Sequence, residues 1–188
     1  MKKHFFDQVL NHLNCISSMA AMENAGRTQR EIINLTDYIR FRLGSKNAII
    51  KLKDELKAVN NLIALYQSRL GTNLRYTENI GNDAKELYFP KHTIMAFVEN
   101  SLFHAFGSKE GVWEIWLRVL KEDKCYIIEI EDNGEGFTGF EPFMDGRVPD
   151  SSISAVIRNL NDYYGSQQEF LSITSNQQGT RVRIGILQ

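Results

Sequence analysis

The sequence predicts an α+β fold in which a helical hairpin precedes an α/β sandwich with a mixed sheet. Apolar residues recur every three or four positions through the first 70 residues, which contain none of the three prolines. From Leu74 onward, short segments instead alternate with the period of two that a strand requires. Charge divides as well: residues 1–50 hold 7 Lys or Arg against 4 Asp or Glu, whereas the whole chain has a formal net charge of −1. We therefore expect two modules, residues 1–48 and residues 49–188.

The first module is predicted to be two antiparallel helices. The first helix, within residues 2–24, carries an apolar seam with alternating steps of three and four residues: Phe6, Val9, Leu13, Ile16 and Ala20. Gly26 is expected to end it in the left-handed conformation, and Thr28 to cap a second helix that runs to about residue 43. A lone hairpin buries little apolar surface, so we expect a second copy of the chain to complete a four-helix bundle.

The second module is predicted to alternate helices with strands. Helices are expected over residues 52–70, from Pro90 to about Ala105 with the proline in the first turn, and over about 152–164. Between Asp132 and residue 150 the chain contains Gly and Pro without periodicity, which is typical of a functional loop such as an active-site lid. The strands are expected at residues 74–80, 112–117, 126–130, 169–174 and 180–187.

Composition excludes several classes of protein. With 22 Lys or Arg against 23 Asp or Glu, the chain lacks the basic excess of a nucleic-acid-binding surface. Cys15 and Cys125 are too few and too far apart for a disulfide framework or a zinc knuckle. No apolar run approaches the roughly 20 residues that span a bilayer, and the start has no secretory signal. We therefore expect a cytoplasmic location and no nucleic-acid partner.

The sharpest local motif is Asp-Asn-Gly-Glu-Gly at residues 132–136, directly after a predicted strand. Gly134 and Gly136 allow the backbone to approach a ligand closely, and the Asp132 carboxylate can accept hydrogen bonds from a buried donor. The alternative is a tight turn at the end of a strand, for which Asp-Asn-Gly is also well suited.

A second motif lies on the predicted helix that begins near Pro90. Asn100 and His104 are one turn apart and share a face, so both can point into one site. An amide oxygen is a hard ligand that suits Mg²⁺, which also binds nucleotide phosphates. The alternative is an Asn that caps the helix or satisfies the core. Gly179-Thr180, at the start of the last predicted strand, is a weaker third signal, but the three together favour a nucleotide site.

These segments resemble the LytS/YehU group of sensor histidine kinases, whose nucleotide domain has the Bergerat ATP-binding fold of the GHKL proteins. The resemblance spans nearly the whole chain. It is carried by residues 3–13 (KHFFDQVLNHL), 97–104 (FVENSLFH), 132–136 (DNGEG) and 179–182 (GTRV).

The resemblance implies that the chain binds ATP and Mg²⁺. Asp132 would bind the adenine amino group and Asn100 would hold Mg²⁺. Gly134 and Gly136 would permit close approach at the base of the lid, and Gly179-Thr180 would lie near the adenine.

The resemblance also implies a phosphorylation pathway. The γ-phosphoryl group of ATP would pass to His4, with Glu99 and His104 near the phosphates, and then to an Asp on the receiver domain of a response regulator. Independently of the family, His4 lies two residues before the seam and is expected to be exposed. His12 is the rival phosphoacceptor, but it adjoins Leu13 of the seam and is expected to be packed.

The position of His4 also bears on the organisation of the protein. Kinases of this group receive signals into the corresponding helix from preceding membrane or sensor segments. The sequence therefore predicts a homodimer that is either the cytoplasmic core of an inner-membrane sensor or a stand-alone relay.

The chain departs from the family in the second glycine box. Asp150 and Ser152 stand where the family has glycines whose backbone N–H groups cradle phosphates, and Asp150 would place a negative charge beside them. A degenerate kinase that acts as a phosphotransfer or scaffold module is therefore the alternative. A third hypothesis is an ATPase of the same fold, but its general base is normally one turn before Asn100, where this chain has Ala96.

Overall fold

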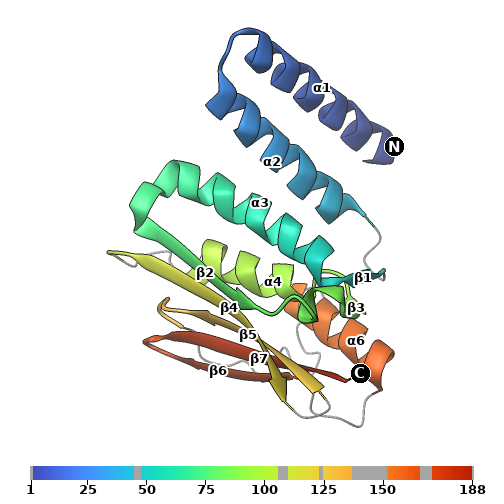
Figure 1. Cartoon of the computed structure of the whole chain (residues 1–188), viewed down its shortest axis with the longest axis vertical. Coiled ribbons are helices and arrows are strands. Elements are labelled where there is room, and N and C mark those ends of the chain that lie inside the picture. The colour runs from blue at the N-terminus through green and yellow to red at the C-terminus, as the bar shows by residue number, and fades with distance from the viewer. Residues whose placement is uncertain are drawn as a thin grey trace.

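The computed structural model describes residues 2–44, 48–105, 110–122, 125–136, 152–165 and 171–187, and Figure 1 shows their arrangement. The predicted α+β fold is confirmed, because two helices precede a unit in which further helices cover one side of a sheet. The helices are α1 (Lys2–Met22), α2 (Gly26–Leu43), α3 (Leu52–Leu70), α4 (Thr93–Asn100) and α6 (Ser152–Tyr164), with short turns η1 (Gly71–Asn73) and η2 (Ala84–Glu86) and the π-helical η3 (Ser101–Ala105). The strands are β1 (Ile49–Lys51), β2 (Leu74–Ile80), β3 (Tyr88–Pro90), β4 (Trp113–Glu122), β5 (Cys125–Asp132), β6 (Leu171–Asn176) and β7 (Gly179–Leu187).

The hairpin forms as expected, but its turn differs from the prediction. Asn24, not Gly26, takes the left-handed conformation, with φ of 55°. Gly26 is already the first residue of α2, and Ala25 occupies the cap without a side-chain hydrogen bond, so Thr28 caps nothing. An asparagine tolerates positive φ because its short polar side chain can bond locally, and it therefore competes with glycine for this role.

The main sheet has five strands in the order β2-β4-β5-β7-β6. β2 runs parallel to β4, whereas every other neighbouring pair is antiparallel, so the sheet is mixed as predicted. Along β5, buried residues alternate with partly exposed ones, which directs Ile128, Ile130 and Asp132 toward the helices. The core between sheet and helices includes Leu52, Val59, Phe89, Ile94, Met95, Leu117, Leu160 and Ile184.

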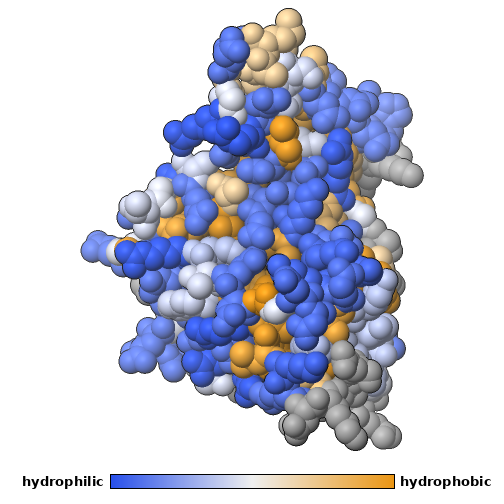
Figure 2. Space-filling model, viewed as in Figure 1, coloured by the Kyte–Doolittle hydropathy of each residue, from blue (hydrophilic) through white to orange (hydrophobic). Residues whose placement is uncertain are grey.

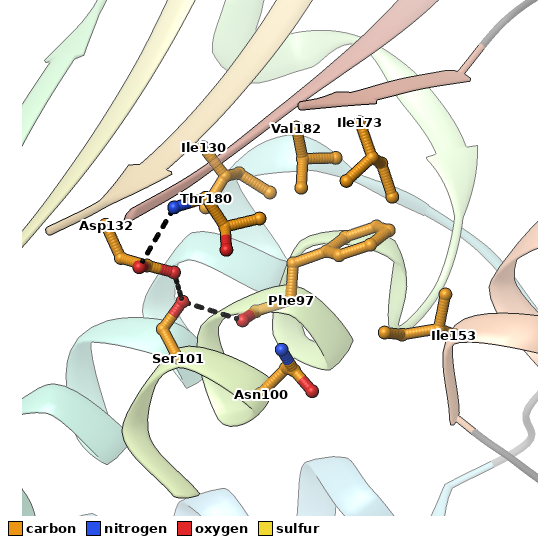
Figure 3. A pocket seen from close by; sticks show the side chains of 9 residues that line it. All are labelled: Phe97, Asn100, Ser101, Ile130, Asp132, Ile153, Ile173, Thr180 and Val182. Carbon is orange, nitrogen blue, oxygen red and sulfur yellow. Dashed lines mark hydrogen bonds between the residues drawn. The ribbon is translucent and has the colours of Figure 1, made fainter. Parts of the chain in front are cut away.

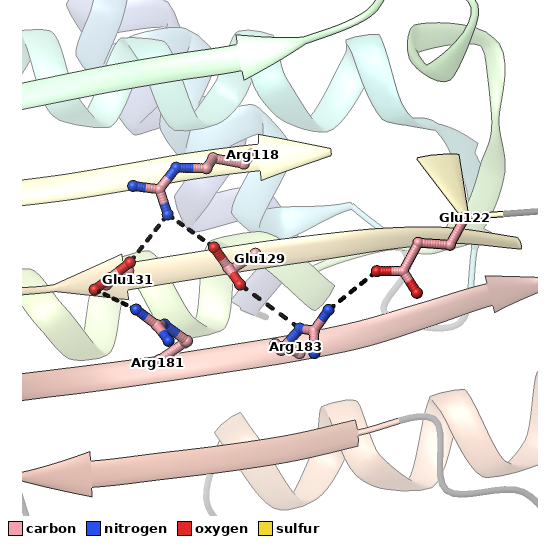
Figure 4. Close-up of polar contacts among 6 residues, drawn as sticks. All are labelled: Arg118, Glu122, Glu129, Glu131, Arg181 and Arg183. Carbon is pink, nitrogen blue, oxygen red and sulfur yellow. Dashed lines mark hydrogen bonds and ion pairs between the residues drawn. The ribbon is translucent and has the colours of Figure 1, made fainter. Parts of the chain in front are cut away.

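The other face of the sheet carries a ladder of ion pairs across β4, β5 and β7 (Figure 4). Arg118 contacts Glu129 at 2.7 Å and Glu131 at 3.0 Å, and Arg181 contacts Glu131 at 3.0 Å. Arg183 contacts Glu122 and Glu129 in the same way. Exposed pairs of this kind add about 1 kcal/mol or less each. Their presence marks this face as the solvent side and leaves the opposite face for the core and the site.

Helix α4 starts three residues later than predicted. Pro90 is not in its first turn but ends β3, which pairs antiparallel with β1, and neither of these short strands was predicted. The buried carboxylate of Glu55, on α3, accepts the backbone N–H groups of His92 at 3.0 Å and of Met95 at 2.9 Å. These are among the donors that a helix start leaves unpaired, so α3 provides the cap of α4 through a distant side chain.

This cap predicts a pH dependence of stability. Burial raises the pKa of Glu55 from 4.5 to about 8, although the backbone N–H groups and Lys91 oppose that rise. The folded chain then binds the proton more tightly than the unfolded chain. The stabilisation is therefore complete below about pH 4.5 and is lost as the pH rises through about 8. Urea titrations between pH 5 and pH 8.5 should show the free energy of unfolding falling with pH.

Glu55→Gln should flatten this pH profile, because it leaves no titrating group at the cap. Exposed Glu110 offers a matched control, and Glu110→Gln should retain the wild-type slope. A wild-type profile that rises or stays level over this range would contradict the assignment.

Hydrophilic residues cover most of the face shown in Figure 2, with hydrophobic residues visible between them. Among the described residues, no helix has both the length and the apolar character needed to cross a membrane. Several large apolar side chains of the hairpin are nonetheless exposed, among them Phe5, Ile16, Met19 and Met22.

Candidate functional site

A pocket lies between α4, α6 and the carboxyl end of β5 (Figure 3). Its free volume is about 10 Å³, room for about one water molecule, so a larger ligand requires the walls to move apart. Five of the residues around it are apolar and four are polar, which suits a flat aromatic ligand with a few hydrogen-bonding groups. The lining residues are Phe97, Asn100, Ser101, Ile130, Asp132, Ile153, Ile173, Thr180 and Val182.

The carboxylate of Asp132 accepts three hydrogen bonds at the edge of the pocket. Asp132 is the last residue of β5, pairs with Thr180 on β7, and is buried. Its Oδ1 accepts the backbone N–H of Gly134 at 2.9 Å and that of Thr180 at 3.3 Å. Its Oδ2 accepts the hydroxyl of Ser101 at 2.6 Å. The carboxylate is thus fixed as an acceptor, and a ligand that uses the remaining capacity of Oδ2 must bring a donor.

Ser101 also belongs to the site, although no sequence motif predicted it. It is buried, directly follows Asn100, and its Oγ lies 2.6 Å from Asp132 and 3.2 Å from the carbonyl oxygen of Phe97. A hydroxyl has one proton, and the short bond to a carboxylate is the stronger of the two. The available signal was a small polar residue beside Asn100, which does not specify a partner 31 positions away.

The helix containing Asn100 and Ser101 changes form at this point. The predicted helix to Ala105 is α-helical only to Asn100 and becomes π-helical over Ser101–Ala105. Such π-helical turns are uncommon and occur frequently at functional sites. Asn100 is partly exposed on the pocket wall, where its side chain remains accessible to a ligand.

The glycines of the site contact protein backbone closely. Gly136 has φ of 65°, and a Cβ there would overlap the carbonyl oxygen of Asn176. Gly179 has φ of 139°, and a Cβ there would overlap the carbonyl oxygen of Asp132. These two glycines are therefore explained by the approach of two chain segments at the edge of the pocket. Gly134 is buried and contributes its N–H to Asp132.

Asn133 has a structural role in the same turn. Its Oδ1 accepts the N–H of Glu114 at 2.9 Å, and its Nδ2 donates to the carbonyl oxygen of Val112 at 3.1 Å. The turn that follows Asp132 is therefore attached to the start of β4. The alternative reading of the motif, a tight turn after a strand, accounts for Asn133, whereas Asp132 faces the pocket.

Glu99 is not among the pocket residues. Its buried carboxylate accepts the hydroxyl of Tyr38 at 2.7 Å and pairs with Arg42 at 3.1 Å, and both partners lie on α2. Consecutive residues of a helix point about 100° apart, so Glu99 faces the hairpin whereas Asn100 faces the pocket. The contacts of Glu99 with Tyr38 and Arg42 do not support the expectation that Glu99 lies near a bound phosphate.

The described histidine side chains, those of His4, His12 and His92, lie outside the pocket lining. His4 is exposed on α1, as expected. His12 is exposed too, contrary to the expectation that it is packed, and its Nδ1 lies 2.8 Å from the carbonyl oxygen of Gln8. It adjoins the seam at Leu13, but that seam is itself only half buried in a single chain. The backbone of His104 belongs to η3, whereas its side chain lies outside the described part of the structure.

The second glycine box is described only in part. Asp150 and the lid residues 137–150 lie outside the described residues, and Ser152 is the first residue of α6. Ile153, next along α6, reaches the pocket wall. This part of α6 therefore contributes an apolar surface to the site.

A larger hollow of about 270 Å³ lies beside the pocket and shares Asp132 and Thr180 with it. It is more open and polar, and Arg181 in its lining is paired with Glu131. The smaller pocket is the better candidate for a nucleobase, because its apolar walls and the fixed Asp132 carboxylate converge there.

Comparison with known proteins finds relatives among the sensor histidine kinases. A family model described as histidine kinase matches residues 1–74. Sensor protein LytS of Bacillus subtilis (strain 168) is 27% identical over 183 residues, which cover 93% of this chain and 30% of that protein. The sensor histidine kinase/phosphatase LytS of Staphylococcus aureus (strain Mu50) is 28% identical over 163 residues, which cover 84% and 27% respectively. The chain thus spans about three tenths of the length of the curated relatives it matches.

Solved structures share the fold. The histidine kinase domain of the blue-light activated histidine kinase from Erythrobacter litoralis EL346 superposes with a TM-score of 0.51 at 19% identity, covering 96% of this chain and 92% of that one. The catalytic domain of histidine kinase ThkA gives a TM-score of 0.53 at 12% identity, covering 74% and 95%. The resemblance predicted from the sequence motifs is confirmed.

Proposed function

We propose that this chain, which is related to the LytS-type sensor histidine kinases, is a kinase core that transfers the γ-phosphoryl group of ATP to His4. The observation that carries the proposal is the pocket in which Asp132, fixed by three donors, presents an acceptor between apolar walls. Such a group recognises a ligand that brings a donor, and the exocyclic amino group of adenine is one.

The chemistry of the neighbouring residues suits an adenine, although the pocket must widen to admit one. Phe97, Ile130 and Val182 provide flat apolar contact, and Ser101 and Thr180 flank the carboxylate. The Thr180 hydroxyl already has a partner, since it lies 2.9 Å from the hydroxyl of Ser175. Gly134 belongs to the site because its backbone N–H donates to Asp132. Gly179 belongs to it because the absence of a side chain lets its backbone lie close to that of Asp132.

The residues present also fit a nucleotide-borne Mg²⁺. Asn100 offers an amide oxygen at the pocket wall, and Mg²⁺ commonly takes one or two protein ligands while phosphates and water supply the rest. No cluster of three or more His, Cys, Asp or Glu side chains that would hold a metal by itself occurs in the described part of the chain. When bound, Mg²⁺ would neutralise phosphate charge, and Asn100 is the residue that we assign to it.

His4 is the proposed acceptor. An unprotonated imidazole nitrogen attacks the γ-phosphorus, a P–N bond forms, the bond from phosphorus to the bridging oxygen breaks, and ADP leaves with that electron pair. In the second transfer, a carboxylate oxygen of an Asp on a receiver domain attacks the phosphorus and the imidazole leaves. Catalysis of this kind depends on alignment and charge neutralisation, and an exposed His4 is accessible for both steps.

The quaternary arrangement follows from the hairpin. We assign residues 1–48 to dimerisation and phosphotransfer and residues 49–188 to nucleotide binding. Helix α1 has an exposed apolar surface that a second copy of the chain would cover. This surface includes Phe5, Ile16, Met19 and Met22. The proposed partners are thus a second chain, a receiver domain and an upstream sensor or membrane segment, with the core on the cytoplasmic side of the inner membrane.

A degenerate kinase that relays or scaffolds without ATP turnover is the second candidate, and Asp150 and Ser152 in place of two glycines favour it. The third candidate, an ATPase, is less well supported. The position one turn before Asn100 is Ala96, and Glu99 is engaged with the hairpin.

The test is labelling with γ-labelled ATP and Mg²⁺. The full chain should acquire an acid-labile, alkali-stable label, and His4→Gln should abolish it. His12→Gln is the matched control, because His12 is exposed on the same helix, and it should retain the label. Label that persists in His4→Gln and disappears in His12→Gln would transfer the role to His12, whereas an unlabelled wild-type chain that binds Mg-ATP would favour the degenerate kinase.

A further inference from the structure

The hairpin is attached to the nucleotide module through Glu99. The described residues give this buried carboxylate two donors, the hydroxyl of Tyr38 at 2.7 Å and the Nε of Arg42 at 3.1 Å. Tyr38 and Arg42 are four residues apart on α2 and so present the same face of the helix. Burial and the Glu99 carboxylate raise the pKa of Tyr38, which keeps its hydroxyl protonated as a donor.

A second attachment joins the end of α2 to the start of α4. The Lys91 Nζ donates to the carbonyl oxygen of Phe41 at 2.7 Å and lies 4.4 Å from the centre of the Phe41 ring. The rings of Phe41 and His92 meet edge to face with centres 5.0 Å apart. A cation at the carboxyl end of α2 is favourable because the last carbonyl groups of a helix carry partial negative charge. The last two turns of α2 thus contact residues next to both ends of α4.

This attachment determines where the helix that carries His4 lies. Figure 1 shows α2 between α1 and α3, so that α1 forms the outermost layer. The pocket is lined by residues of α4, η3, α6 and the sheet, with none from α1 or α2. Phosphoryl transfer requires the attacking nitrogen to approach to about 3–3.5 Å. While α2 stays fixed to α4, α1 is kept on the far side of α2 from the pocket.

We propose that Tyr38, Arg42 and Glu99 form an interdomain latch that holds the hairpin in a resting arrangement and must open before His4 is phosphorylated. Arg42 remains partly exposed, with 38% of its side-chain surface accessible, so the latch can open to water without leaving an arginine buried. Glu99 directly precedes Asn100, the proposed Mg²⁺ ligand, so release of the latch and nucleotide occupancy would act on the same turn of α4. The inference rests on the proposed kinase function.

The first experiment measures the latch itself, without phosphorylation. Tyr38→Phe removes one hydroxyl and keeps the ring, and hydrogen–deuterium exchange should become at least several-fold faster in residues 36–43 and 93–100. Arg40→Met is the matched control. Arg40 is on the same helix but bonds Asp37 at 3.3 Å and Asn14 at 3.4 Å, both within the hairpin, so exchange in residues 93–100 should not change. Equal exchange in wild type and Tyr38→Phe would overturn the latch whether or not the chain is a kinase.

The second experiment measures its consequence. Tyr38→Phe and Arg42→Met should each raise the initial rate of His4 labelling several-fold, with Mg-ATP affinity within twofold of wild type, while Arg40→Met labels at the wild-type rate. The double variant Tyr38→Phe/Glu99→Gln should label no faster than the faster of the two single variants Tyr38→Phe and Glu99→Gln. Both substitutions remove the same contact, so their effects should not add. If Tyr38→Phe exchanges hydrogen faster but labels at the wild-type rate or more slowly, the latch does not restrain phosphorylation of His4. A wild-type chain that neither binds nor uses Mg-ATP would refute the proposed function, and the exchange experiment would still decide whether the latch exists.

Discussion

Asp132→Asn is expected to lower the affinity for Mg-ATP by about 10- to 100-fold, since a hydrogen bond to a charged group contributes roughly 1.5–3 kcal/mol. The geometry specifies how the amide would lie. Oδ1 of Asp132 accepts two backbone N–H groups, from Gly134 and Thr180, so in the variant the oxygen stays there and Nδ2 takes the place of Oδ2. A donor would then face the donor amino group of adenine.

The same geometry predicts an altered preference among purines. Inosine triphosphate carries a keto oxygen where ATP has the amino group, and that oxygen can accept from the new Nδ2. Titration calorimetry should therefore show that Asp132→Asn loses affinity for ATP but not for inosine triphosphate. Asp83→Asn is the control, because Asp83 bonds Tyr126 away from the pocket and should leave both affinities unchanged. Equal loss for both nucleotides would mean that Asp132 maintains the fold of the site without reading the base.

Gly179→Ala is expected to have the largest effect on stability, about 3 kcal/mol or more, because it combines backbone strain with steric overlap. Gly179 has φ of 139°, a backbone conformation that residues with a side chain rarely adopt. The Cβ of an alanine there would overlap the backbone oxygen of Asp132. Backbone atoms cannot rotate away as the end of a flexible side chain can. The paired ends of β5 and β7 would separate, and urea denaturation should show a lower midpoint or no cooperative transition.

Gly111→Ala separates the two causes. Gly111 also has positive φ, at 97°, but no atom lies within 4 Å of its added Cβ. Strain alone costs about 1–3 kcal/mol, so this variant should unfold at a midpoint between those of wild type and Gly179→Ala. If the two variants lose the same stability, the close approach of Gly179 to Asp132 contributes nothing.

The helices and strands with strong periodicity were predictable from the sequence. Residues 52–70 form α3 as expected, because their apolar face packs on the core, and β2 and β5 follow the alternation of their side chains. The errors fall where local preference competes with distant contacts. Pro90 ends a strand instead of starting a helix, since α4 is capped by Glu55 from α3, and no local pattern encodes that contact.

The candidate site was also predictable only in part, because some of its residues depend on contacts with distant segments. Asp132, Asn100 and Thr180 come from three separate segments that the structure brings to one pocket. Ser101 was missed because its role depends on a bond to a residue 31 positions away. The family resemblance implied that Glu99 lies near the phosphates, but adjacent residues of a helix face different neighbours, and α2 lies on the side of Glu99. Motifs therefore located the segments, while side-chain direction required the structure.

The most direct test of the central claim, that the pocket at Asp132 holds an adenine nucleotide, is calorimetric titration of the wild-type chain with Mg-ATP. We expect saturable binding of one nucleotide per chain, weakened by about 10- to 100-fold in Asp132→Asn and retained in Asp83→Asn. An absence of binding at millimolar Mg-ATP, or binding that is the same in Asp132→Asn as in wild type, would contradict it.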